Sequence, residues 1–97
     1  MELKFEWDEN KNVKNIKKHK VSFEEATMVF SDLRRYEIFD KKHSLIEKRW
    51  IVIGLAGIKI LRVIFTERNE KIRIITAKKA DKNDMEVYFY GNGTTNN

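Results

Sequence analysis

Three apolar, β-branched runs separated by short turns occupy the second half of the chain and restrict what it can fold into. They are Arg49–Ala56, Lys59–Thr66 and Lys71–Ala80, with Gly57 in the first turn and Glu67–Glu70 in the second. Connections this short join antiparallel neighbours. Because the runs are almost continuously apolar, both sheet faces should be at least partly covered. The sequence therefore predicts a three-stranded antiparallel meander.

Arg73 places a permanent positive charge inside the last run. Strict alternation along a strand predicts two sets of side chains on opposite faces: Arg73, Ile75, Ala77 and Lys79 against Ile72, Ile74, Thr76 and Lys78. A guanidinium group favours water, a carboxylate or a phosphate. We therefore expect Arg73 at an open part of the sheet or beside an anion. The alternative is an arginine that only reaches solvent from a half-covered sheet.

The N-terminal third carries strand and helix signals. Leu3–Trp7 alternates apolar and charged residues, which is typical of a strand with one buried face, and Asp8 can cap a helix running to about Lys18. Val13 and Ile16 form the thin apolar stripe of that helix. The polar ridge beside it, which we interpret as a solvated face, consists of Lys11, Asn15 and Lys18.

A second helix is predicted to begin at Ser22, because Ser22 and Glu25 have the spacing of a capping box. Apolar residues follow at helical spacing and indicate an end near Ser31 or Asp32. Residues 34–40 resemble a less regular strand at an edge of the sheet.

The C-terminal residues are ambiguous. Asp81 can cap a helix through about Tyr88, but Val87–Tyr90 fits a strand equally well. Residues 91–97 are small or polar, which is typical of a disordered tail. We expect one domain over residues 1–90, because 97 residues suffice for a single core. The predicted fold class is α+β, with a small antiparallel sheet packed against two N-terminal helices.

Composition narrows the class of partner. A formal net charge of +5 favours an acidic or polyanionic partner. No apolar run approaches the roughly 20 residues needed to cross a bilayer, and the start lacks the apolar core of a signal peptide. The chain has no cysteine, which excludes disulfides and thiol chemistry. We expect a cytoplasmic protein that does not act at a membrane.

The sequence contains few patterns that are typical of a metal, cofactor or catalytic site. No familiar metal-site spacing and no glycine-rich phosphate loop occurs, so we expect no metal and no cofactor. RNA cleavage needs few groups, because the 2′-hydroxyl is the nucleophile: a base removes its proton, cations stabilise the phosphate, and an acid protonates the leaving oxygen. His43 and Glu47 compete as the base. The candidate cations are Arg49, Arg68, Arg73 and Lys78.

The two candidate bases predict different pH dependence. We favour His43 for proton transfer and Glu47 for orienting Arg49. A histidine base predicts an activity limb near about pH 6.5 or somewhat lower, and a glutamate base predicts one near or below about pH 4.3.

Short motifs in a fixed order connect the chain to a known family. In the N-terminal part they are Phe5–Asp8, Lys11, Asn15, Lys18-His19 and Val21–Ala26. Further along they are Asp40, His43-Ser44, Glu47, Arg49-Trp50, Ile53-Gly54, Thr66–Arg68 and Ile72–Ala80. In this order and spacing the chain resembles the BrnT toxins of bacterial type II toxin–antitoxin systems.

The resemblance implies a fold similar to the RelE-type ribonucleases and RNA cleavage that inhibits translation. It implies neutralisation by a BrnA-like antitoxin with a ribbon-helix-helix part, and contact with operator DNA only through the antitoxin complex. We expect the antitoxin to cover the basic groove. The residues that we expect to bind RNA outside the catalytic set are Lys11, Lys18, His19 and Lys79.

Two positions depart from the family pattern. Lys20 stands where glycine is common, which argues against a left-handed helix cap, and Lys78 stands where arginine is common, which removes a bidentate fork. Two other functions fit the sequence. One is a non-catalytic nucleic-acid-binding or regulatory module of the same fold, and the other is an interaction protein whose basic face only binds an acidic partner.

Overall fold

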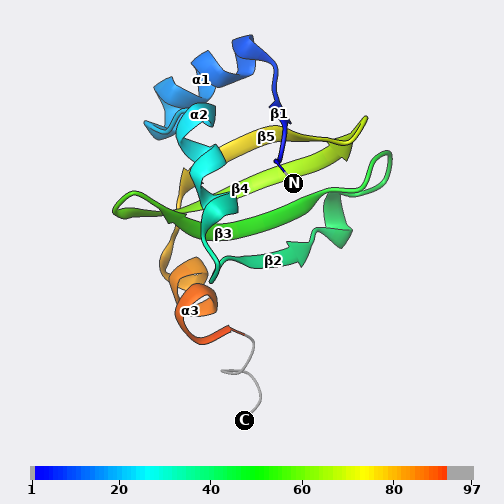
Figure 1. Ribbon diagram of the computed structural model, residues 1–97. Helices are drawn as coiled ribbons and strands as arrows, with labels where there is room; N and C mark the ends of the chain where they lie inside the picture. Colours follow the sequence, from blue (N-terminus) through cyan, green and yellow to red (C-terminus); the bar gives the residue numbers. More distant parts are fainter. Residues whose placement is uncertain (1, 92–97) are drawn as a thin grey trace.

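A five-stranded mixed sheet forms the centre of the computed structural model, which describes residues 2–91 (Figure 1). The strands lie in the order β1-β5-β4-β3-β2. Their bounds are β1 (Phe5–Glu6), β2 (Tyr36–Phe39), β3 (Trp50–Ala56), β4 (Lys59–Arg68) and β5 (Lys71–Lys79). The helices are α1 (Glu9–His19), α2 (Phe23–Ala26) and α3 (Lys82–Tyr90), with 3₁₀ turns η1 (Thr27–Ser31) and η2 (Lys41–His43).

The predicted meander is confirmed, because β3, β4 and β5 pair antiparallel in sequence order. The edge position predicted for residues 34–40 is also confirmed, with β2 at one end of the sheet. The prediction of an all-antiparallel sheet is wrong. Strand β1 pairs parallel with β5, with Phe5 opposite Ile72 and Glu6 opposite Arg73.

A β-bulge in β5 overturns the predicted distribution of its side chains between the two faces. Phe65 lies opposite Ile74, but the preceding Ile64 lies opposite Thr76, so Ile75 has no partner of its own on β4. One extra residue reverses the alternation beyond the bulge. Ala77 is therefore fully buried on the same face as Ile74, whereas Thr76 now shares the face of Arg73.

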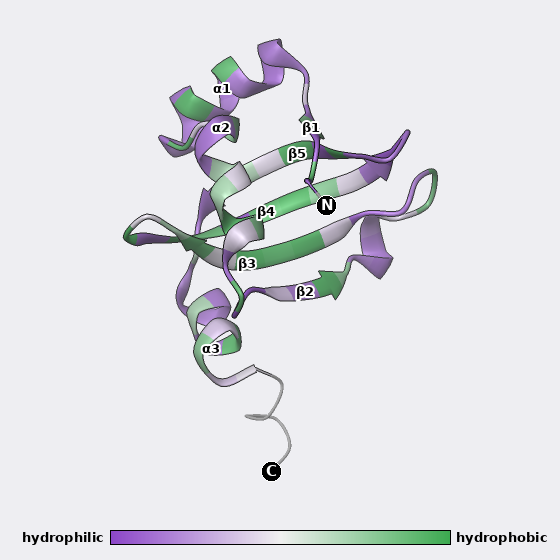
Figure 2. Cartoon of the chain, in the orientation of Figure 1, coloured by the Kyte–Doolittle hydropathy of each residue, from purple (hydrophilic) through white to green (hydrophobic). Residues whose placement is uncertain are grey.

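The core lies between the sheet and the α2–η1 segment, which crosses in front of the strands in Figure 1. The rings of Phe30 and Phe65 meet at 5.0 Å, and Gly54 leaves room for Val29, whose Cβ would lie 3.0 Å from an added Cβ. Figure 2 shows the apolar band of β3 and β4 behind η1. The second predicted helix does end at Ser31, but only its first four residues are α-helical.

Helix α1 buries polar residues and exposes apolar ones, so the predicted orientation is wrong. Asn12 and Asn15 are 2% and 7% exposed, whereas Val13 and Ile16 are 49% and 41% exposed. The predicted caps at both ends can be compared directly. Asp8 caps the helix as expected. The prediction from Lys20 against a left-handed cap is wrong, because Lys20 adopts that conformation with φ 62° although it is not glycine.

The side-chain amide of Asn15 explains why this polar face is buried. Its nitrogen donates to the carbonyl oxygens of Ala77 at 2.7 Å and Val21 at 2.8 Å, and its oxygen accepts from the Ala77 amide at 3.2 Å. Asn15 thus satisfies the outer edge of β5 at a point beyond the short β1.

The ambiguous C-terminal segment is a helix. Asp81 and Asp84 form a capping box at its start, Asp84 pairs with Arg62 at 3.4 Å, and Gly91 caps its end. The predicted tail, apart from Gly91, lies outside the described residues. No helix of the described chain is long and apolar enough to cross a membrane.

Candidate functional site

A row of polar residues crosses the far face of the sheet, which is the face turned away from α2 and η1. Glu6 lies opposite Arg73, and Arg73 lies opposite Thr66. Continuing the β3–β4 register by one position places Arg49 opposite Thr66. Adjacent strands are about 4.8 Å apart, so Arg49 and Arg73 approach the face from strands roughly 10 Å apart, with Thr66 between them.

Arg73 lies beside an anion, as the sequence predicted, and that anion is the carboxylate of Glu6. The closest atoms are 3.3 Å apart, and both side chains are partly exposed. A pair of this exposure is weak and can exchange partners. A phosphate group could therefore replace Glu6 as the partner of Arg73 without the free-energy cost of breaking a buried ion pair.

Glu47 pairs with Arg68, not with Arg49. The carboxylate lies 3.3 Å from the guanidinium of Arg68, one row beyond the Arg49–Thr66–Arg73 row. The structure therefore gives Glu47 a charge partner different from the one that we expected.

Arg49 is the cation of this region whose hydrogen bonding is incomplete. Its Nε atom is buried and has no hydrogen-bond partner within residues 2–91. Buried N–H groups are nearly always paired, because an unpaired one forfeits its hydration. Because this atom has almost no accessible surface, a ligand can accept its N–H only after the side chain shifts.

Asp40 orients the ring of His43. Its carboxylate lies 3.0 Å from Nδ1 of His43 and also accepts the His43 amide. Asp40 is 8% exposed, whereas the side chain of His43 is 61% exposed. With Nδ1 directed at the carboxylate, Nε2 is the nitrogen left to exchange a proton with a ligand. The sequence predicted no role for Asp40 in the site. Its position three residues before His43 is nevertheless typical of a residue that caps a short 3₁₀ turn.

The connection between β2 and β3 gathers several predicted site residues around one cavity of about 420 Å³. Its lining consists of Lys42, His43, Leu45, Ile46, Glu47 and Arg49. Three of the predicted catalytic residues thus meet here, Arg68 joins them through Glu47, and Arg73 lies two strands away.

Lys78 does not join this group. It lies opposite Arg62 on β4, four positions from the Thr66 that lies opposite Arg73. At about 3.3 Å per residue, Lys78 is therefore roughly 13 Å from Arg73 along the sheet.

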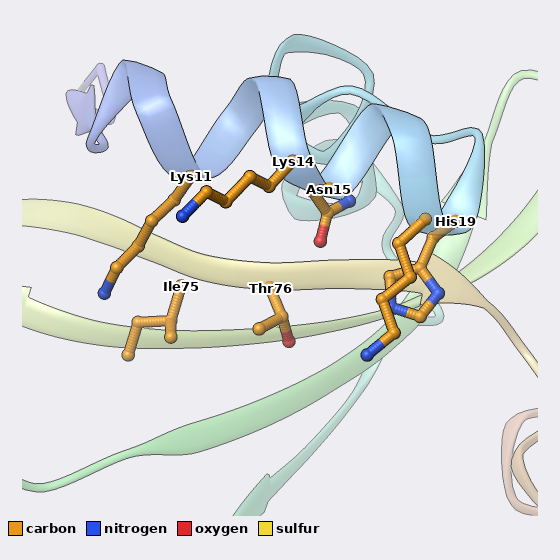
Figure 3. Close-up of a pocket in the computed structure, with 7 residues that line it drawn as sticks. Lys11, Lys14, Asn15, His19, Ile75 and Thr76 are labelled. Carbon is orange, nitrogen blue, oxygen red and sulfur yellow. The ribbon is translucent and has the colours of Figure 1, made fainter.

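Three of the four predicted RNA-binding residues line a second hollow, between α1 and β5 (Figure 3). This α1–β5 groove has a volume of about 250 Å³. It is lined by Lys11, Lys14, Asn15, Lys18, His19, Ile75 and Thr76. Sequence reasoning missed Lys14, although it follows Lys11 by three positions and precedes Lys18 by four on the helix. Lys79 lies outside the groove, at the exposed end of β5.

The electrostatics of the groove affect His19. Burial lowers the pKa of His19 below its ordinary value, and the positive charges of Lys18 and Lys78 lower it further. His19 is therefore neutral at pH 7, and an anion in the groove would favour its protonation. Within residues 2–91 no three His, Asp or Glu side chains gather to hold a metal ion.

The fold and these two basic hollows define a small α+β protein that presents cations beside an Asp–His pair. Residues 7–84 match the model of the family described as ribonuclease toxin, BrnT, of type II toxin–antitoxin systems. The match covers well over half of the chain, so the chain belongs to this family of ribonuclease toxins, and the resemblance found in its motifs is confirmed. The type II toxin–antitoxin assignment implies an antitoxin partner. A comparison with curated proteins finds no match.

Proposed function

We propose that this chain is an endoribonuclease that cleaves RNA without a metal ion and inhibits translation in the cytoplasm. We further propose that its fold is similar to that of the RelE-type ribonucleases and that RNA binds on its sheet. The observation that carries the proposal is the Asp40–His43 pair at 3.0 Å, on the rim of the cavity that contains Arg49. An oriented imidazole beside a guanidinium group supplies a base and a phosphate ligand together.

The reaction uses the 2′-hydroxyl as nucleophile. Nε2 of His43 takes the hydroxyl proton, and the 2′ oxygen forms a bond to phosphorus. The bond between phosphorus and the 5′ oxygen breaks, and the imidazolium of His43 returns the proton to that oxygen. The products are a 2′,3′-cyclic phosphate and a free 5′-hydroxyl, so proton and charge balance without another reactant.

The arginines stabilise charge on the phosphate during this step. Arg49 donates to the phosphate from the wall of the cavity, and Arg73 exchanges Glu6 for a phosphate oxygen. Preorganised donors of this kind each contribute about 10²–10³ in rate. Arg68 pairs with Glu47 beside the cavity, so this carboxylate already has a cation partner.

RNA on either side of the scissile phosphate is held by the α1–β5 groove and its neighbours, Lys11, Lys14, Lys18, His19, Lys78 and Lys79. In Figure 3, Lys11 reaches past β5 toward the side on which Ile75 and Thr76 lie. Thr76 is also opposite Ile64 on the far face, so the groove is continuous in the sheet with the row that contains Arg73.

A second candidate function is a non-catalytic nucleic-acid-binding module. It is favoured by the pairing of Arg73 with Glu6 and of Arg68 with Glu47, because both cations have carboxylate partners before any ligand arrives. In either case we propose that the partner is a ribbon-helix-helix antitoxin. Operator DNA would then be contacted through the antitoxin complex.

The test is cleavage of end-labelled single-stranded RNA by the purified chain in excess EDTA. We expect cutting by the wild type and a loss of about 10²–10⁴ in rate for His43→Ala. Arg34→Ala is the control, because Arg34 is exposed and lies outside both hollows. Binding without cutting by the wild type would favour the second candidate, and cutting that requires added metal would refute metal independence.

A further inference from the structure

Two adjacent aliphatic side chains stand almost fully in solvent at the rim of the His43 cavity. Leu45 is 94% exposed and Ile46 is 99% exposed, and both line that cavity. Isolated exposed leucines are common, but neighbouring ones beside a functional cavity indicate a surface that is covered in a complex.

Charge surrounds this apolar pair on both sides. Lys41 and Lys42 precede it, and Lys48 and Arg49 follow it, while the intervening carboxylate of Glu47 is paired with Arg68. Such a surface complements a segment that carries apolar side chains together with carboxylates. Arg49, which lines the same cavity, places a permanent positive charge beside this apolar pair.

We propose that the antitoxin neutralises the toxin at this loop with an acidic, amphipathic segment. Its apolar side chains cover Leu45 and Ile46, and one of its carboxylates enters the cavity and pairs with the guanidinium of Arg49. The proposal rests on the proposed function, because occupation of this cavity neutralises the toxin only if RNA is cleaved there.

A protein segment fits this loop better than a nucleobase. Bases stack on aromatic rings or on exposed guanidinium planes, whereas residues 41–48 contain no phenylalanine, tyrosine, tryptophan or arginine, and the ring of His43 is oriented by Asp40. Aliphatic side chains instead favour apolar partners that exclude water.

The test compares two double variants of the full chain in direct titrations with the purified antitoxin encoded by the neighbouring gene. Leu45→Ser/Ile46→Ser should weaken Kd at least about 10²-fold, because two apolar anchors are lost. The matched control is Leu33→Ser/Ile58→Ser, whose side chains are 95% and 97% exposed elsewhere on the molecule and which should bind normally.

A second measurement examines the cavity itself. An uncleavable 2′-deoxy oligonucleotide at saturating concentration should raise the apparent Kd of the antitoxin for the wild type. An unchanged Kd in the Leu45/Ile46 variant, or an equal loss in the control, would overturn the proposal. Loss of RNA cleavage with unchanged antitoxin binding would assign the loop to RNA. If the wild type cuts no RNA, the proposed function fails, whereas the docking surface is still tested by the Kd comparison.

Discussion

The hydroxyl of Tyr88 donates a 2.6 Å hydrogen bond to Oδ2 of Asp32, which also accepts the amide of Leu55 at 2.8 Å. One carboxylate thus fastens α3 to the end of η1 and to β3. Burial would raise the pKa of Asp32, but the hydrogen bonds from Tyr88 and from the Leu55 and Arg34 amides lower it overall. The same bond, with burial, raises the pKa of Tyr88.

Removing this hydroxyl should destabilise the fold in a pH-dependent manner. Tyr88→Phe should lower the free energy of unfolding by about 1–2 kcal/mol at pH 7, since the lost bond has a charged acceptor. The folded pKa of Asp32 is depressed, so its contribution is complete above the ordinary value of 3.8 and is lost as pH falls through the folded value. Urea unfolding at neutral and acidic pH measures the difference, which should shrink in acid.

The control for this prediction is Tyr90→Phe, because Tyr90 is 69% exposed and its replacement should change the free energy of unfolding by less than about 0.5 kcal/mol. An equal effect of Tyr88→Phe at both pH values would show that the bond to the ionised carboxylate is not the cause.

Most elements of the fold could be predicted from local signals, whereas several of their faces could not. The caps at Asp8 and Ser22 and the meander follow from residue type and spacing. The bulge at Ile75 leaves no mark in a run of β-branched residues, so the alternation rule placed Ala77 on the wrong face. Asn15 looked like a solvated helix residue because its partner, the Ala77 backbone, is 62 positions away.

Asn15→Ala should be strongly destabilising for the same reason. The substitution leaves the carbonyl oxygens of Val21 and Ala77 and the amide of Ala77 without their side-chain partner. Buried unpaired groups cost about 1–3 kcal/mol each, and partial access of water limits the total to roughly 3 kcal/mol. Thermal or urea unfolding measures the loss. Asn10→Ala, at an exposed position of α1, should be nearly neutral, and a similar loss there would point to helix propensity instead.

The α1–β5 groove should determine the salt dependence of RNA binding. Lys11→Gln/Lys18→Gln removes two cations that line the groove. Each lost phosphate contact should reduce the slope of log K against log salt by about 0.7 for a single strand. Binding titrations of the double variant at several salt concentrations should therefore show a slope smaller by about 1.4.

Lys4→Gln/Lys82→Gln is the control for this slope, because it removes the same net charge from exposed positions outside the groove. A slope reduced equally by both double variants would show that net charge, not the groove, governs binding. His19 also predicts a pH dependence of RNA binding. Its lowered pKa keeps it neutral at pH 7, so the affinity for RNA should rise as pH falls below about 6.5.

The residues of the candidate site could be predicted from the sequence, but the ion pairs between them could not. His43, Glu47 and Arg49 lie close in sequence, and the structure places them around one cavity. The pairing of Glu47 with Arg68 depends on the β3–β4 register, which a sequence pattern does not fix to one residue. Lys78 and Arg73 lie five positions apart on β5, so their separation follows from the length of the strand between them.

Expression of this chain alone should arrest growth, and Arg73→Ala should relieve the arrest without unfolding the protein. A lost preorganised donor costs about 10²–10³ in rate. Glu6→Gln separates the two roles of Arg73, because it breaks the same ion pair but leaves the guanidinium free for phosphate. We expect Glu6→Gln to remain toxic. If both variants lose toxicity, or if folded Arg73→Ala remains fully toxic, Arg73 is a structural residue.

The choice between His43 and Glu47 as the base can be tested by pH dependence and by substitution. If neutral His43 is the base, single-turnover cleavage should be lost at a higher pH on acidification than it would be with a carboxylate base at Glu47. Asp40→Asn keeps the shape of the side chain but removes the charge that holds Nδ1 at 3.0 Å, so kcat should fall about 10²-fold with KM little changed. Because Asp40 is buried, thermal unfolding of Asp40→Asn tests whether the lost activity reflects a loss of folding. A His43→Ala enzyme that cleaves at the wild-type rate throughout this acidification would remove His43 from the mechanism and leave Glu47 as the better candidate.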